Sequence, residues 1–239
     1  MKISKKEQAK TREKILKTAI ELIGENGYKK TSMSKIAKKA KIGEATIYNY
    51  FPTKEDILYE YFYSLQIKSK KKLLEIEEFN SFSLKEQIQL LLNTQLEILR
   101  EDRSFVLEVF SEVFYKPFSN YGFKKGEEEL LLMVEELVDI AIDANEIEPI
   151  DFGSLFKGLF SNYYYGVIYY WIYDKSDNFN NTTVMLDKSL DVMYAALQSG
   201  IITKAQELFA FIVKTHILSY IKPLKKYNKR EFGKWKEHQ

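Results

Sequence analysis

Apolar residues recur along this chain at the three- and four-residue spacing of helices, and little of it alternates as half-buried strands do. The first stripe consists of Ile15, Leu16, Ala19, Ile20, Leu22 and Ile23. Ser4 and Glu7 before it have the spacing of a capping box, and Gly27 follows it. The pattern therefore predicts a first helix over about Lys5 to Asn26.

Two very short helices are predicted next, joined by a tight turn. Ser32 is a typical N-cap for a helix from Met33 to about Ala40, and the three residues that follow are too few for anything but a turn. Gly43 can then cap a third helix, Glu44 to Tyr50. The residues expected to bury this pair of helices are Ile36, Ala37, Ile47 and Phe51. This layout is typical of a helix-turn-helix, which places one helix in the major groove of DNA.

The remainder divides into further helices at visible breaks. Pro52 blocks continuation of the third helix, and Thr53 begins a long fourth one with acidic residues in its first turn. The later breaks and starts are Ser83 to Glu86, Asp102 to Ser104, Pro117 with Asn120 and Gly122, Gly126 to Glu129, Pro149, Asp177 to Asn181, Gly200 and Pro223. They predict an aromatic helix over about Asp151 to Asp174, a ninth helix closed by Gly200, and a tenth before Pro223.

Composition supports an all-α globular fold. The chain is 45% hydrophobic and has only 10 Gly and 4 Pro in 239 residues, so helix formers meet few breakers. The absence of cysteine excludes disulfides and thiolate metal sites and, with no evident signal peptide, predicts a cytoplasmic protein. The uncharged segment from Gly158 to Tyr173 is shorter than the ~20 residues of a membrane span and holds six tyrosines, so a buried helix is expected instead of a membrane segment.

Charge is distributed unevenly along the chain. Residues 1–54 hold 14 basic residues against 5 acidic ones, residues 55–200 hold 13 against 26, and residues 201–239 hold 9 against 3. A basic N-terminal segment on an acidic body suits a protein that binds the phosphate backbone with one end, because DNA repels an acidic surface.

Three segments carry a family resemblance. In order and spacing, Thr11 to Leu16, Ile36 to Ala40 and Thr46 to Leu58 resemble the N-terminal domain of TetR-family transcriptional regulators. Where that family usually has Gly then Ser at the turn, this chain has Lys41 and Gly43. The resemblance implies a three-helix DNA-binding domain over residues 1–53 and a larger helical ligand-binding and dimerisation domain over residues 54–200. Residues 201–239 form an extra helix and basic tail of unassigned role.

The expected DNA contacts lie on the second and third helices and just after them. They are Ser34, Glu44, Ala45, Thr46, Tyr48, Asn49, Tyr50 and Lys54. The Asn49 amide can bond an adenine bidentately, whereas hydroxyl groups such as those of Ser34 and Thr46 suit phosphate oxygens. The resemblance implies a phosphate contact for Lys54. Lys2, Lys5, Lys6 and Lys10 either follow the DNA backbone or form a solvated leader, and the lysines at 68 and 70–72 are expected to form a solvated face.

The aromatic helix allows two interpretations. Its tyrosines and phenylalanines cover every side, so they pack in a core or against a second subunit, or they line a cavity for a hydrophobic or aromatic small molecule. The resemblance implies such a cavity, with the candidate lining residues Phe105, Phe160, Tyr163, Tyr164 and Tyr170. Motifs of enzyme, metal or cofactor sites are missing, and His216 and His238 are far apart, so we expect no enzyme, no metal and no cofactor.

These observations together predict a homodimeric transcriptional regulator. We expect it to be a repressor that leaves a pseudo-palindromic operator when a small-molecule effector binds its body. Its partners would be double-stranded operator DNA, the effector and a second copy, with no membrane. The alternative is a ligand-independent architectural or protein-tethering DNA-binding protein with a filled body.

Overall fold

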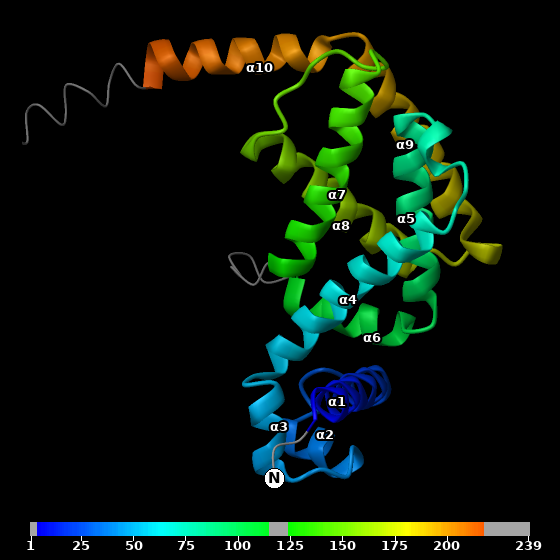
Figure 1. Cartoon of the computed structure of the whole chain (residues 1–239), viewed down its shortest axis with the longest axis vertical. Coiled ribbons are helices and arrows are strands. Elements are labelled where there is room, and N and C mark those ends of the chain that lie inside the picture. Colours follow the sequence, from blue (N-terminus) through cyan, green and yellow to red (C-terminus); the bar gives the residue numbers. More distant parts are fainter. Residues whose placement is uncertain (1–3, 115–123, 218–239) are drawn as a thin grey trace, which may run out of the picture.

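The structure is a computed structural model that describes residues 4–114 and 124–217. Over these residues the chain is helical and contains no strand, so the predicted all-α class is confirmed. The molecule is elongated (Figure 1), with the first three helices at one end and α10 (Ile201–Ile212) projecting at the opposite end.

The three N-terminal helices form a small domain, which we call the head. They are α1 (Lys5–Asn26), α2 (Met33–Lys39) and α3 (Glu44–Tyr50). The predicted Ser4–Glu7 capping box is present, and the Ser32 hydroxyl caps α2 by accepting from the Lys35 N–H. The core of the head is made of Ile15, Ala19, Ile36, Ala37, Ile47, Phe51 and Ile57. The helix-turn-helix is therefore packed as the apolar pattern predicts.

The turn between α2 and α3 has an unusual residue in the left-handed region. Lys41 has a φ of 53°, a conformation that costs a residue with a side chain roughly 1 kcal/mol. Gly43 is the N-cap of α3 in an extended conformation and supplies no side-chain bond. The displaced glycine of the sequence thus caps the helix, and a lysine takes the strained position of the turn.

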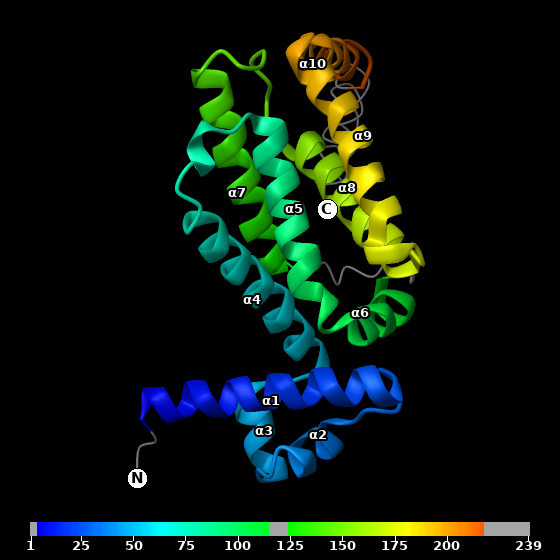
Figure 2. The same ribbon diagram turned by 90° about the vertical axis from the view of Figure 1, so that its right-hand side faces the viewer.

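The body begins with α4 (Lys54–Leu74), which leaves the head and runs into the larger bundle (Figure 2). The other body helices are α5 (Leu84–Arg100), α6 (Arg103–Val109), α7 (Lys124–Asp143), α8 (Ser154–Tyr173) and α9 (Asn180–Gln198). Short turns of other helix types lie at Phe79–Ser81, Phe110–Phe114, Asp177–Phe179 and Val213–Ile217. The boundary predicted between residues 53 and 54 stays a prediction.

Two predicted helix starts are displaced. The aromatic helix begins at Ser154 and not near Asp151, because both backbone polar groups of Asp151 bond the Gln206 side chain of α10. The helix predicted from Gly126 already begins at Lys124. The break predicted at Pro117, Asn120 and Gly122, and the end of the tenth helix near Pro223, lie outside the residues that the structure describes.

Close approach of α4 and α7 explains a glycine in the body. A Cβ atom on Gly126 would lie 2.9 Å from the carbonyl carbon of Phe62 and 3.1 Å from the backbone nitrogen of Tyr63. These are backbone atoms, which cannot turn aside as a side chain can. Gly126 therefore sets the distance between α4 and α7, which pack along each other.

We expect Gly126→Ala to lower the free energy of unfolding by about 1–3 kcal/mol, because the overpacking outweighs the gain in helix propensity. Gly158→Ala in α8 is the matched control, compared at protein concentrations at which the chain is monomeric, since a Cβ there meets no atom of its own chain within 4 Å and should stabilise slightly. Urea denaturation of both variants measures the difference. Equal stability changes in the two variants would contradict the proposed close contact.

Candidate nucleic-acid interface

The outer face of α3 is exposed. Ile47 is buried in the core of the head, whereas Glu44, Ala45, Tyr48 and Asn49 face solvent, with Tyr48 48% exposed. The side chain of Asn49 makes no hydrogen bond to the residues that the structure describes. An unpaired amide on the surface of a short, firmly packed helix is free to bond an external partner.

A groove of about 530 Å³ separates this face from the start of α1. The α3 wall is formed by Thr46, Asn49 and Tyr50, and the α1 wall by Lys5, Gln8, Ala9 and Arg12. Thr46 and Tyr50 are half-buried there. The α1 wall adds Gln8 to the predicted set. The α1 wall residues are three and four positions apart in the sequence, so they could be predicted to share one face of the first helix. The sequence near them does not show that this face lies opposite α3.

Arg12 holds α3 in place. Its guanidinium donates to the Tyr50 carbonyl (3.0 Å) and to the Glu60 carboxylate of α4 (2.7 Å), and it lies 4.4 Å from the centre of the Phe51 ring. Only a planar, multi-donor cation can make all three contacts. Arg12 therefore fixes the C-terminal end of α3 against α1 and α4, a positioning role that the sequence motif contains but does not explain.

Lys54 has its ammonium group directed into the protein. The Nζ atom donates to the carbonyls of Tyr28 (2.6 Å) and Thr31 (2.9 Å) and lies 3.7 Å from the centre of the Tyr28 ring. Burial lowers the pKa of this lysine. Two of its three N–H donors are thus used to hold the connection between α1 and α2. The phosphate contact expected for Lys54 stays a prediction and would use the third donor.

Lys54→Ala is therefore expected to destabilise the head as well as to weaken DNA binding. Loss of two charge-assisted hydrogen bonds should lower the free energy of unfolding by about 2–3 kcal/mol and reduce affinity for operator and random DNA by the same factor. Lys38→Ala, at an exposed position of α2, is the control that removes a charge without a buried partner. Unchanged urea stability of Lys54→Ala would contradict the internal role.

The surroundings of the interface are basic. Lys5, Lys6 and Lys10 are exposed along the start of α1, and Lys38 and Lys41 are exposed beside the turn. Ser34 is exposed at the start of α2, where its hydroxyl can reach a phosphate. Lys2 lies outside the residues that the structure describes. The expected contacts on and just after the second and third helices all lie on or beside one end of the molecule, with Lys54 directed inward.

Comparison with known proteins agrees with this geometry. Residues 15–61 match the family model described as "Bacterial regulatory proteins, tetR family". Residues 87–212, more than half of the chain, match "Tetracyclin repressor-like, C-terminal domain". The chain belongs to the TetR family. It is thus a DNA-binding transcriptional regulator and not an enzyme.

Relatives of this TetR-family regulator are known from Bacillus subtilis (strain 168). The "Fatty acid metabolism regulator protein" is 52% identical over 48 residues, which are 20% of this chain and 25% of that protein. The uncharacterised HTH-type regulator YhgD is 29% identical over 139 residues, which are 57% of this chain and 72% of that protein. A solved structure of Bacillus subtilis FadR in complex with stearoyl-CoA is 25% identical, with a TM-score of 0.57, and covers 78% of this chain and 97% of that one.

The predicted effector residues fall in three different environments. Phe105, Phe160 and Tyr164 are buried in the core of the body. The Tyr163 hydroxyl bonds the Ser189 hydroxyl of α9 (2.8 Å), and Tyr170 is 43% exposed on the outer face of α8. The first three thus belong to the same hydrophobic core, and whether they contact an effector stays a prediction.

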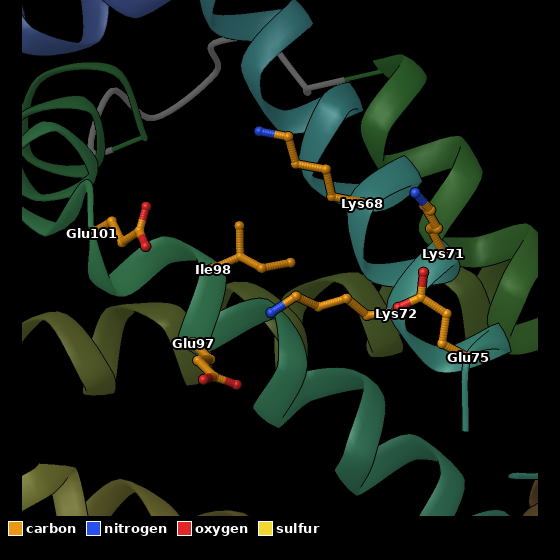
Figure 3. Close-up of a pocket in the computed structure, with 7 residues that line it drawn as sticks. All are labelled: Lys68, Lys71, Lys72, Glu75, Glu97, Ile98 and Glu101. Carbon is orange, nitrogen blue, oxygen red and sulfur yellow. The ribbon is translucent and has the colours of Figure 1, made fainter. Parts of the chain in front are cut away.

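Lysines of α4 line an open groove in the body, shown in Figure 3. The groove has a volume of about 460 Å³, and its lining residues are Lys68, Lys71, Lys72, Glu75, Glu97, Ile98 and Glu101. Three lysines and three glutamates share it, so its charges balance and neither sign of ligand is favoured.

None of the described helices is both long and apolar enough to cross a bilayer.

Proposed function

We propose that this regulator is a homodimeric repressor that leaves its operator when a hydrophobic small molecule binds the body. The observation that supports DNA binding is the exposed outer face of α3 on a basic head. Two heads would occupy successive major grooves about 34–36 Å apart on a pseudo-palindromic site. Asn49 would read a base, with Glu44 and Ala45 at the groove floor, while Ser34, Thr46, Tyr48 and Tyr50 would position the helix on phosphates.

An uncharged face of α8 supports the homodimer. The exposed positions of this helix follow one stripe, made of Gly158, Leu159, Asn162, Gly166, Tyr169, Tyr170 and Tyr173. The opposite side packs into the core through residues such as Trp171. A solvent face with glycines, leucine and three tyrosines but no charge is typical of the centre of a protein interface. Leu208, Phe209 and Phe211 on α10 are exposed apolar side chains as well, at the far end of the body.

The contact between α6 and α1 supports coupling of body and head. The Glu108 carboxylate of α6 accepts from the Tyr28 N–H (3.2 Å), and a Cβ atom on Gly24 of α1 would lie 3.3 Å from the Phe105 backbone nitrogen. Phe105 packs edge-on against Tyr61 of α4 (4.7 Å between ring centres). An effector that displaces α6 would therefore tilt α1, and coupling of about 1–3 kcal/mol would change operator affinity roughly 5- to 150-fold.

Similarity to FadR bound to stearoyl-CoA favours an effector with an apolar chain. The alternative, a ligand-independent DNA-binding protein, would be favoured if no small molecule changes operator affinity. Both hypotheses give the head the same DNA-binding role, and they differ only in whether the body binds an effector.

Selection of random duplex DNA on the full-length protein, followed by sequencing, tests the proposal. We expect enrichment of two inverted half-sites whose centres lie about one helical turn apart. Titration of the selected operator complex with fatty acyl-CoA and, in parallel, with uncharged long-chain alcohols then tests release. The absence of any preference for a duplex over heparin would exclude the regulator proposed here, whereas selection without release would favour the alternative.

A further inference from the structure

Four uncharged polar side chains meet inside the hydrophobic core of the body. They are Gln66 and Ser69 of α4, Gln95 of α5 and Tyr164 of α8, and each is at most 3% exposed. The Gln95 Nε2 atom donates to Gln66 Oε1 (2.6 Å) and, more weakly, to the Ser69 hydroxyl (3.4 Å). Gln66 Nε2 donates to the Tyr164 hydroxyl (3.4 Å). We call these residues the polar cluster.

The polar cluster has unused hydrogen-bonding capacity. The Gln95 Oε1 atom is fully buried and has no partner among the residues that the structure describes. Turning the Gln95 amide by 180° does not remove the deficit, since its Nε2 atom would then lie in the same place without an acceptor. Burial raises the pKa of the Tyr164 hydroxyl far above its usual range, so that group keeps a proton that it can donate. Buried polar atoms are rarely left unpaired, which indicates that an external group completes the cluster.

A mostly apolar pocket lies one helical turn away on the same helix faces. Its volume is about 110 Å³, and Leu73, Leu91, Met133 and Leu137 are among its lining residues. The charged residues Lys70 and Glu136 also line it and pair with each other (3.9 Å). Leu73 is four residues after Ser69, and Leu91 is four residues before Gln95. Residues four apart share a helix face and are separated by roughly 6 Å along the axis. The pocket and the polar cluster therefore follow each other along the interface of α4 and α5.

We infer that the polar cluster is the inner end of the effector site and that it selects an apolar molecule bearing one uncharged polar group, such as a hydroxyl or a carbonyl. This inference rests on the proposed function. The apolar part would occupy the pocket, which α4, α5 and α7 line together, and its polar group would bond Gln95 and Tyr164. A charged group is disfavoured, because none of the four side chains is charged and an unpaired ion is costly to bury.

Matched six-carbon probes test this selectivity on the full-length protein. We expect 1-hexanol to bind saturably and sodium hexanoate at neutral pH to bind at least tenfold more weakly, as measured by calorimetry. Gln95→Met keeps the length of the side chain and should weaken 1-hexanol binding about five- to tenfold. Tyr164→Phe, which removes only a hydroxyl, should weaken it similarly and provides a second test if Gln95→Met folds poorly.

Thr182→Val is the matched control. Thr182 of α9 is buried like the polar cluster, but its hydroxyl donates to the Asp174 carboxylate (2.7 Å) and it does not line the pocket. The control should lower thermal stability and leave 1-hexanol binding unchanged. No saturable 1-hexanol binding, or equal binding by wild type and both cluster variants, overturns the inference. Operator binding is measured separately. If it is retained while the inference fails, the proposed function still stands.

Discussion

Gly166→Arg is expected to convert the protein to a monomer and to reduce operator affinity about 100- to 10,000-fold. Tethering two heads makes the second binding event intramolecular, and that gain is lost when the dimer dissociates. Gly166 is central in the uncharged stripe of α8, and a Cβ there meets no atom within 4 Å. The arginine therefore costs the isolated chain little. In a two-fold interface each copy would bury an unpaired cation near its symmetry mate.

Analytical ultracentrifugation and operator titration measure the two parts of this prediction. Leu132→Arg is the control, because it introduces the same charge at an exposed position of α7. It should remain dimeric and bind the operator as the wild type does. A Gly166→Arg protein that stays dimeric at micromolar concentration would exclude α8 as the centre of the interface. Circular dichroism of both variants separates dissociation from unfolding.

The head could be predicted almost to the residue because its signals are local. Ser4, Gly43 and Thr53 each lie at a helix start, and each cap depends only on the next three residues. Only the last residue of the second helix differs, since α2 ends at Lys39 and not at Ala40. Helix-turn-helix geometry adds a fixed register, so the exposed face of α3 follows from its buried one.

The body was less predictable because its signals depend on tertiary contacts. Apolar side chains surround α8, so helical spacing gave no contrast between the face that packs in the core and the face with Tyr170. The α8 start moved to Ser154 through contacts with Gln206, which is more than fifty residues away. Nothing near Lys54 in the sequence shows that its ammonium group turns toward Tyr28. The unpaired Gln95 oxygen is likewise a property of packing.

The recognition role of Asn49 follows from its exposed amide. Asn49→Ala should weaken binding to the selected operator by about 1–3 kcal/mol for each half-site and leave binding to random duplex DNA nearly unchanged. The reason is that an asparagine amide pairs bidentately with adenine, whereas non-specific affinity comes from phosphate contacts, which the lysines of the head still make. The variant should also tolerate substitution of one base pair per half-site that the wild type rejects.

Competition titrations at fixed salt, with operator and random duplexes compared in parallel, check this prediction. Lys38→Ala provides the contrasting variant, because losing an exposed cation should lower both affinities alike and reduce the salt dependence of binding. An equal loss on both duplexes for Asn49→Ala would mean that its amide bonds the backbone instead of a base. Base reading would then fall to Tyr48 and to the N-terminal residues of α3, Glu44 and Ala45, which are exposed on the same face.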